Sequence, residues 1–177
     1  MILGLKRGTI RLVPHQKGWA KAFADEKRRL TVTLNTPGII IEHVGSTAVS
    51  GLVAKPVIDM AIAVETIEQI RWWPQLLAVD DYTYFGDREG RGEYFFAKGP
   101  DERRTFYLHV MELRSERWHN YLTFRDRLRH SRQLRAEYEA LKIGAASSTP
   151  DRDAYTALKE EFVVRLIARR SHPSAPR

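Results

Sequence analysis

The stretch that most constrains the fold is 39–64, where two apolar runs flank a turn of small residues. The first run, 39–44, is short and β-branched, as in a buried strand. The second run, 56–64, alternates, so that its one carboxylate, Asp59, shares a face with small residues while larger apolar residues share the other. The stretch therefore predicts two strands joined by a turn, with one acidic side chain on the small-residue face.

The turn between these runs is equipped to hold phosphate. It carries Gly45, Ser46 and Thr47, and a Gly-Ser turn between strands exposes backbone N–H groups and a hydroxyl. The first strand ends at this turn and the second begins after it, so we expect the turn and Asp59 to meet at the rim of one pocket. In metal-dependent nucleotidyl transfer such a carboxylate holds Mg²⁺. The alternative is that Asp59 only caps a neighbouring strand end.

Two histidines and a lysine are further candidates for this pocket. His109 lies on a predicted strand at 104–112, on the face that carries polar residues. It is a candidate metal ligand or phosphate contact, and the alternative is a hydrogen-bonded structural residue. His43 adjoins the turn and either touches a phosphate or satisfies the turn backbone. Lys55 stands at the mouth of the second strand, placed to reach a phosphate, although a surface lysine needs no such role.

Later helices supply three more candidates. Arg125 lies on a predicted helix, where it either turns towards the site or is solvated. Tyr155 and Lys159 are one helical turn apart and share a face, so they are placed to line the same cleft. The alternative for this pair is a core tyrosine with a lysine extending beside it to solvent.

The order of elements predicts an α+β fold with a C-terminal helical segment. The expected elements are an edge strand at 9–13, a helix at 19–34, a helix from Thr66 interrupted at Pro74, strands at 82–85, 93–98 and 104–112, and three helices to about 170. The last of these helices is expected to be capped by Asp151 and to bury Tyr155, Leu158, Phe162 and Leu166. We expect a core at 1–113, a helical segment packed on it at 114–170, and a disordered tail at 171–177.

Composition excludes several classes of protein. The chain contains no cysteine, which excludes disulfides, thiolate metal sites and a thiol nucleophile. No apolar run approaches the roughly 18 residues of a membrane helix, so a cytoplasmic protein without membrane contact is expected. The net charge is +7, with arginines concentrated in the late helices. This excess indicates either a solvated basic surface or association with nucleic acid, although no RNA-binding motif accompanies it.

The turn and its flanks resemble a known family. The block from His43 to Asp59, HVGSTAVSGLVAKPVID, resembles the signature of the GrpB family, also called UPF0157. The likeness extends to Trp19, to the F-R-D-R-L-R run at 124–129 and to later tyrosine and lysine positions. This resemblance implies the nucleotidyltransferase superfamily, with a polymerase-β-like mixed-sheet core and a helical C-terminal part, and a poorly defined function.

The chain departs from the active pattern of that superfamily at one position. Active nucleotidyltransferases carry a second acid two residues after the first, and here that position is Ala61. If the protein is active, the resemblance implies transfer of a nucleotidyl group from a nucleoside triphosphate to an unidentified acceptor. Ser46, Thr47 and the turn N–H groups would then hold the triphosphate and Asp59 would hold Mg²⁺ or Mn²⁺.

In the same active form, Lys55 and Arg125 would balance the phosphate charge and His109 would assist. The alternative, which Ala61 favours, is a non-catalytic module of the same fold that senses a nucleotide or docks on another protein. On either hypothesis the expected ligand is a nucleotide or another phosphate-bearing small molecule, with nucleic acid a less favoured partner.

Overall fold

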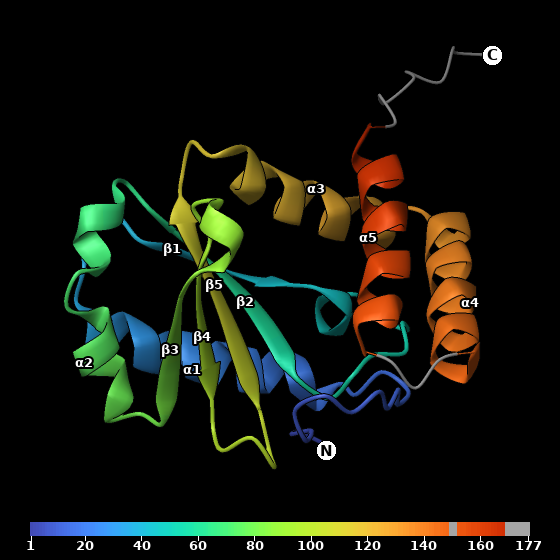
Figure 1. The fold of residues 1–177 in the computed structure, drawn as a ribbon, viewed down its shortest axis with the longest axis horizontal. Coiled ribbons are helices and arrows are strands. Elements are labelled where there is room, and N and C mark those ends of the chain that lie inside the picture. Colours follow the sequence, from blue (N-terminus) through green and yellow to red (C-terminus); the bar gives the residue numbers. More distant parts are fainter. Residues whose placement is uncertain (149–151, 169–177) are drawn as a thin grey trace.

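A five-stranded mixed sheet forms the centre of the computed structural model, which describes residues 1–148 and 152–168 (Figure 1). Its strands, in the order β1-β2-β5-β4-β3, are β1 Ile40–Val44, β2 Ile58–Val64, β5 Phe106–Glu112, β4 Tyr94–Lys98 and β3 Tyr82–Asp87. Strands β2 and β5 are parallel, and every other neighbouring pair is antiparallel. The predicted α+β class with a mixed sheet is confirmed.

Helices lie on both faces of this sheet and beside the turn that follows β1. They are α1 Gly18–Leu34, α2 Trp73–Ala78, α3 Glu116–His130, α4 Arg132–Ser148 and α5 Arg152–Ala168. Helices α1 and α2 cover one face and α3 crosses the other, while α4 and α5 pack side by side (Figure 1). None of the helices in the described ranges is long and apolar enough for a membrane crossing.

The larger apolar side chains of β2 build the core against α1. Ile58, Met60 and Ile62 are fully buried on this face and pack in one cluster with Trp19 and Leu30 of α1. Burying each such side chain contributes about 1.5–3 kcal/mol. The alternation predicted from the sequence therefore fixes which face of β2 meets α1, and a slip of one residue would bury Asp59 instead.

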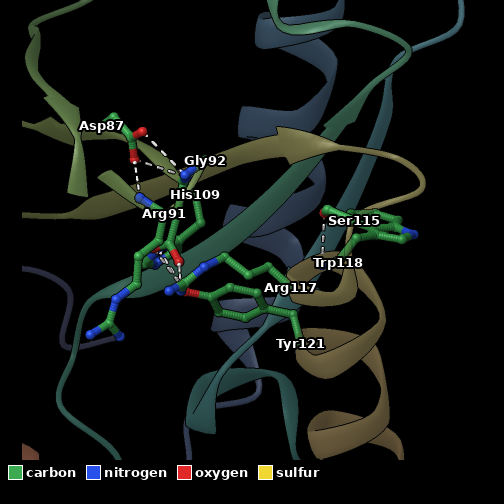
Figure 2. Close-up of polar contacts among 9 residues, drawn as sticks. Asp87, Arg91, Gly92, His109, Ser115, Arg117, Trp118 and Tyr121 are labelled. Carbon is green, nitrogen blue, oxygen red and sulfur yellow. Dashed lines mark hydrogen bonds and ion pairs between the residues drawn. The ribbon is translucent and has the colours of Figure 1, made fainter. Parts of the chain in front are cut away.

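The small-residue face of β2 lies under α3. Ala61 and Ala63 are fully buried there beside Val44, and Trp118 of α3 packs over them. Because alanine side chains are short, the helix axis comes close to the sheet. Helix α3 begins after Ser115, whose hydroxyl accepts a hydrogen bond from the Trp118 backbone N–H at 3.3 Å (Figure 2). This packing places the side chains of α3 over the strand that carries Asp59.

The C-terminal helices hold the turn between β1 and β2. Val49 and Leu52 of the turn are buried in one cluster with Phe124 of α3, Tyr138 of α4 and Phe162 of α5. A long connection normally lies exposed on the surface and is mobile. Here the apolar side chains anchor the turn between three helices, so its hydroxyl and N–H groups are fixed relative to α4 and α5.

Of four further predictions about elements, one is wrong, one is confirmed and two fall on residues that the structure does not describe. No strand forms at 9–13: Val13 makes one isolated bridge, to Ala54, because no neighbouring strand continues the pairing. The break or second start expected at Pro74 is confirmed as a second start: a 3-10 turn at Ile67–Ile70 precedes α2, and Pro74 lies in the first turn of that helix. The predicted cap residue at 151 and the predicted tail at 171–177 lie outside the described residues.

The buried stripe of α5 is narrower than predicted. Tyr155, Phe162 and Leu166 are buried, as expected, but Leu158 is 42% exposed. The apolar partners of α5 come from α3 and α4 on one side, and Leu158 is not among the residues of that cluster. Its place in the predicted stripe was therefore wrong.

Candidate functional site

The glycine turn and the strand carboxylate are in contact. Val44 pairs with Asp59 across β1 and β2, so the next residue, Gly45, starts the turn directly beside that carboxylate. Gly45 has φ 69° and ψ −168°, a region that is essentially restricted to glycine. A Cβ at this position would lie 2.5 Å from Asp59 Oδ2. The meeting of turn and carboxylate that the two-strand pattern predicted is present, and the Asp59 side chain is 32% exposed.

On β5, the strand next to β2, a histidine lies between two carboxylates. His109 pairs with Ala61 across β2 and β5, so its ring points to the α3 face. Its Nε2 lies 3.4 Å from Asp59 Oδ1, and its Nδ1 lies 2.8 Å from Glu93 Oε1. Glu93 immediately precedes β4 and is buried. The histidine therefore connects the exposed carboxylate to a buried one.

Helix α3 completes this arrangement. Tyr121 and Arg117 point from α3 towards His109 (Figure 2). The Tyr121 hydroxyl donates to Glu93 Oε1 at 3.1 Å, and Arg117 Nη1 lies 2.8 Å from Glu93 Oε2. We call the five residues Asp59, Glu93, His109, Arg117 and Tyr121 the histidine network. Within it every charged side chain faces one of opposite sign.

The histidine network stabilises an imidazolium at neutral pH. Burial alone would lower the pKa of His109, but hydrogen bonds and charges from Asp59 and Glu93 outweigh burial and raise the pKa to about 9. Burial would likewise raise the pKa of Glu93, but His109 and then Arg117 lower it to about 2. Both ring nitrogens of His109 therefore donate, and neither has a lone pair for a metal.

These residues do not fit a resident two-metal centre. Mg²⁺ takes oxygen ligands, and two-metal sites hold both ions between shared carboxylates. Asp59 contributes one carboxylate, Ala61 occupies the position of a second, and His109 is engaged on both nitrogens. No group of three or more histidine, aspartate or glutamate side chains is arranged to hold a metal in the part of the chain that the structure describes.

A buried lysine lies against the other side of the turn. Lys142 of α4 is 1% exposed, and its Nζ donates to Ser46 Oγ at 3.1 Å and to the Val53 carbonyl oxygen. The amine also lies 4.7 Å from the centre of the Tyr138 ring. Burial, followed by the charge of Lys159, outweighs the opposing charge of Glu139 and lowers the pKa of Lys142 to about 7. The charged form of this amine is therefore destabilised where it lies.

Two more lysines approach the same place. Lys55 Nζ lies 4.5 Å and Lys159 Nζ 5.1 Å from the centre of the Tyr155 ring. Tyr155 is buried, which raises its pKa to about 12. We call Ser46, Lys55, Tyr138, Lys142, Tyr155 and Lys159 the Lys142 cluster. The structure thus brings together four of the predicted phosphate contacts, Ser46, Lys55, Tyr155 and Lys159, although they come from distant segments of the chain.

His43 and Thr47, which were predicted to contact phosphate, do not join this cluster. The His43 ring stacks on Phe23 of α1 with 4.7 Å between ring centres, on the core side of the sheet. Its Nε2 lies 2.9 Å from Thr47 Oγ1, and both side chains are buried. Burial lowers the pKa of His43 to about 4, so the ring is neutral. Strand alternation, which separates His43 from Asp59, accounts for this placement.

Arg125 also differs from its predicted role as a phosphate contact. Its guanidinium is bound by Glu42 Oε2 at 2.5 Å, by Asp126 Oδ1 at 2.7 Å and by the His43 carbonyl oxygen at 3.2 Å. Two carboxylates therefore neutralise its charge. Arg125 attaches α3 to β1 and positions the turn that follows.

Three further arginines of the late helices donate to backbone carbonyl oxygens. Arg127 donates to the carbonyl oxygen of Leu166, and Arg129 Nε donates to that of Ala48 at 3.1 Å. Arg135 Nη1 donates to the carbonyl of Arg129 at 2.7 Å. These arginines tie helices to one another and to the turn, and the association of the late helices with nucleic acid stays a prediction.

Sequence reasoning missed several members of both groups. Tyr138 and Lys142 are four residues apart on α4 and share a face, a spacing that was available as a signal. Glu93 had no such signal. Its position depends on Asp87, whose carboxylate accepts the backbone N–H groups of Arg91, Gly92 and Glu93 at 3.1–3.2 Å. Figure 2 shows this turn above His109.

The mixed sheet, the Gly-Ser turn and the strand aspartate beside it define the class of protein, one with a nucleotidyltransferase fold. The structure of Cid1, a poly(U) polymerase, in complex with a UTP analogue aligns with a TM-score of 0.54 at 13% identity, over 82% of this chain and 48% of that one. At this level of identity the likeness shows the fold alone.

Within this class, the chain belongs to the GrpB family. The family model described as GrpB protein matches residues 9–169. The glutamate-rich protein GrpB of Alkalihalophilus pseudofirmus is 32% identical over 171 residues, covering 94% of this chain and 98% of that one. The crystal structure of the conserved protein GrpB from Enterococcus faecalis aligns with a TM-score of 0.76 at 28% identity, over 88% of this chain and 98% of that one. The family membership implied by the sequence is therefore confirmed.

Proposed function

We propose that this GrpB-family protein binds a nucleotide, with the phosphates of the nucleotide against the Gly45 turn and the Lys142 cluster. The observation that carries the proposal is the amine of Lys142. This amine is buried and its hydrogen-bond acceptors are a hydroxyl of Ser46 and a backbone carbonyl, both neutral. A phosphate oxygen at this position would supply the negative charge that these partners lack, and charge-assisted hydrogen bonds are the stronger kind.

The surroundings favour a nucleotide over inorganic phosphate. Lys55 and Lys159 add positive charge near the Tyr155 ring, and Ser46 begins a turn whose N–H groups are suited to phosphate. Several phosphates in series match three lysines better than one phosphate does. The fold supports the same proposal, since the fold relative named above is described in complex with a UTP analogue.

A second candidate function is nucleotidyl transfer, and the position of Asp59 favours it. Its carboxylate is partly exposed and touches the phosphate-binding turn. In this reaction an acceptor hydroxyl attacks the α-phosphorus, the bond to the β-phosphate breaks, and pyrophosphate leaves while Asp59 takes the hydroxyl proton. Because Ala61 occupies the strand position of a second carboxylate, Mg²⁺ or Mn²⁺ enters this proposal only as a companion of the bound triphosphate.

A thermal-shift titration tests the binding proposal. The four common nucleoside triphosphates are titrated with Mg²⁺, with Mn²⁺ and with EDTA, and at least one is expected to raise the melting temperature. Lys142→Met is expected to weaken the binding of that nucleotide about tenfold or more, because a charge-assisted hydrogen bond is lost. Lys21→Met, on the exposed side of α1, is the matched control and keeps parental affinity. Failure of every triphosphate to stabilise the parent overturns the proposal.

Pyrophosphate release separates the two candidate functions. Steady release that disappears in Asp59→Asn supports transfer. Stabilisation by a nucleotide without any product, in the presence of candidate acceptors, supports the non-catalytic module and contradicts transfer.

A further inference from the structure

A second cationic cavity lies on the α3 face of the sheet, towards its β3 edge. Its volume is about 230 Å³. Three arginines and three aromatic residues line it: Arg7, Arg88, Arg104, Phe85, Phe95 and Tyr107. None of these residues belongs to the histidine network or the Lys142 cluster.

The cavity adjoins Asp59 on the side opposite the Gly45 turn. Asp59 pairs with Tyr107 on β5, and Tyr107 pairs with Ala97 on β4, so the three side chains form one row on the same face. Neighbouring strands are about 4.8 Å apart, and the cavity therefore begins about one strand spacing from Asp59. Since Gly45 touches Asp59 from the β1 side, the carboxylate stands between two cationic regions.

Arginines and aromatic rings are stacked in this cavity. The Arg88 guanidinium lies 4.7 Å from the centre of the Phe95 ring, and that of Arg7 lies 5.5 Å from the Phe85 ring. The two phenylalanine rings are 5.8 Å apart. Phe85 is 40% exposed on a strand at the sheet edge, so part of its ring is accessible to a ligand. Arginine and aromatic faces together stack on nucleobases, and guanidinium groups also bind phosphate.

Arg104 has a supporting role there. It is buried, pairs with Asp101 and donates to the carbonyl oxygens of Ala97 and Gly99. Asp101 also lies 3.4 Å from Arg7, whose side chain is half exposed. One carboxylate thus faces two of the three guanidinium groups, and the lining keeps a positive charge that favours an anionic ligand.

We propose that this cavity binds one nucleotide unit of an acceptor, with its base stacked on the phenylalanine pair and its phosphate on Arg7 or Arg88. The volume is below the roughly 300–1,000 Å³ of sites that enclose a whole ligand, which fits a single unit. A free mononucleotide and the end of a single-stranded RNA both present such a unit. The inference rests on the proposed function, because the Lys142 cluster takes the donor nucleotide and this cavity takes the second one.

Binding of two probes tests this inference. AMP is titrated by calorimetry, and a labelled single-stranded RNA hexamer by fluorescence anisotropy, both at low and at physiological salt. Arg88→Gln and Phe85→Leu remove a guanidinium and a ring from partly exposed positions, so the fold is expected to tolerate both. Each variant is expected to bind at least one probe about fivefold or more weakly than the parent, because one stacking or cation–π contact is lost. Arg114→Gln, at a side chain that is 91% exposed beyond the end of β5, is the matched control.

The outcomes distinguish this inference from the proposed function. Tight AMP binding indicates a mononucleotide acceptor, and binding of the hexamer alone indicates an RNA end; both support the cavity. The inference is overturned if neither probe binds the parent, if Arg114→Gln weakens binding as much as Arg88→Gln does, or if Lys142→Met abolishes binding of the probes. If no triphosphate stabilises the protein but a probe still binds in a way that depends on Arg88, the proposed donor site is contradicted and the acceptor cavity is supported.

Discussion

The histidine network and the Lys142 cluster both adjoin the Gly45 turn, but they hold buried charge in different ways. In the network, His109 lies between Asp59 and Glu93, and Glu93 also pairs with Arg117. In the cluster, the amine of Lys142 donates to a hydroxyl and a carbonyl oxygen, and two more lysines lie nearby. The charges of the histidine network are already paired, whereas an anion would stabilise the charge of the Lys142 cluster.

This difference assigns different roles to the two groups. A network of paired charges fixes the position of Asp59 and attaches α3 to the sheet, and breaking it exposes uncompensated charge to a low dielectric. A buried lysine with a lowered pKa has the opposite property, because an incoming phosphate repays the desolvation of its charge. We therefore expect substitutions in the network to change stability and substitutions in the cluster to change ligand binding.

The largest expected effect is on stability, from Glu93→Gln. The substitution keeps the size of the side chain but leaves the His109 imidazolium and Arg117 without their shared carboxylate. Removing one partner of a buried ion pair destabilises by about 3–5 kcal/mol. Urea unfolding measures this loss, with exposed Glu102→Gln as a control expected to stay within about 0.5 kcal/mol of the parent. Equal stability of the two variants would show that the network is not structural.

The second prediction uses pH to separate the two groups. The pKa of His109 is about 9 in the folded protein and about 6.5 unfolded, so its stabilisation is complete below about pH 6.5 and is lost as the pH rises through 9. The pKa of Lys142 is about 7 folded and about 10.4 unfolded, so its destabilisation is complete below pH 7 and is relieved as the pH rises. Between pH 7 and 9 the two contributions oppose each other, and the parent stability is expected to stay nearly constant.

Lys142→Met removes one of these opposing contributions. One uncompensated proton changes stability by about 1.4 kcal/mol per pH unit, so the variant is expected to lose about 2–3 kcal/mol between pH 7 and 9. Urea unfolding at pH 7, 8 and 9 measures the slope for the parent and the variant. His109→Gln is the reciprocal test, and its stability should rise over the same range. Parallel slopes for all three proteins would contradict the proposed charge states.

The third prediction concerns the glycine that joins the two groups. Gly45→Ala introduces strain at a positive φ and also a methyl group 2.5 Å from Asp59 Oδ2. Gly51→Ala is a matched control in the same turn, with φ +79° and open space around the added carbon. A positive φ costs about 1–2 kcal/mol in the left-handed helical region, and both the extended ψ of Gly45 and the contact with Asp59 should add to this cost at Gly45. If the two variants unfold at the same urea concentration, the contact between turn and carboxylate is not as close as described.

The parts of this site that the sequence predicts are those set by local periodicity. Strand alternation placed Asp59 on the face of Ala61, and the small residues of the turn indicated a phosphate site beside it. Helical spacing put Tyr155 and Lys159 on one face of α5. These inferences needed only the geometry of single elements.

The parts that the sequence did not predict depend on how distant elements pack. Arg125 carries its charge in any context, but only the packing of α3 on β1 brings Glu42 to neutralise it. Glu93 precedes its strand at a position where the sequence does not show which side chains it will meet. Lys142 resembles any helical lysine until the turn between β1 and β2 is folded against α4.

The smallest expected effect is that of Lys159→Met, which tests whether Lys159 acts through its charge on Lys142 or contacts the phosphates directly. Lys159 is the second cause, after burial, of the lowered pKa of Lys142, so Lys159→Met should raise the pKa of Lys142 and lose one cation near the phosphates. These changes act in opposite directions on nucleotide affinity near pH 8, and we expect a loss of less than about tenfold, smaller than in Lys142→Met. NMR titration of the lysine side-chain signals measures the pKa, and calorimetry with the stabilising nucleotide measures affinity. Lys21→Met should change neither quantity. A loss as large as that in Lys142→Met would instead place Lys159 in direct contact with the phosphates and make Lys142 the supporting residue.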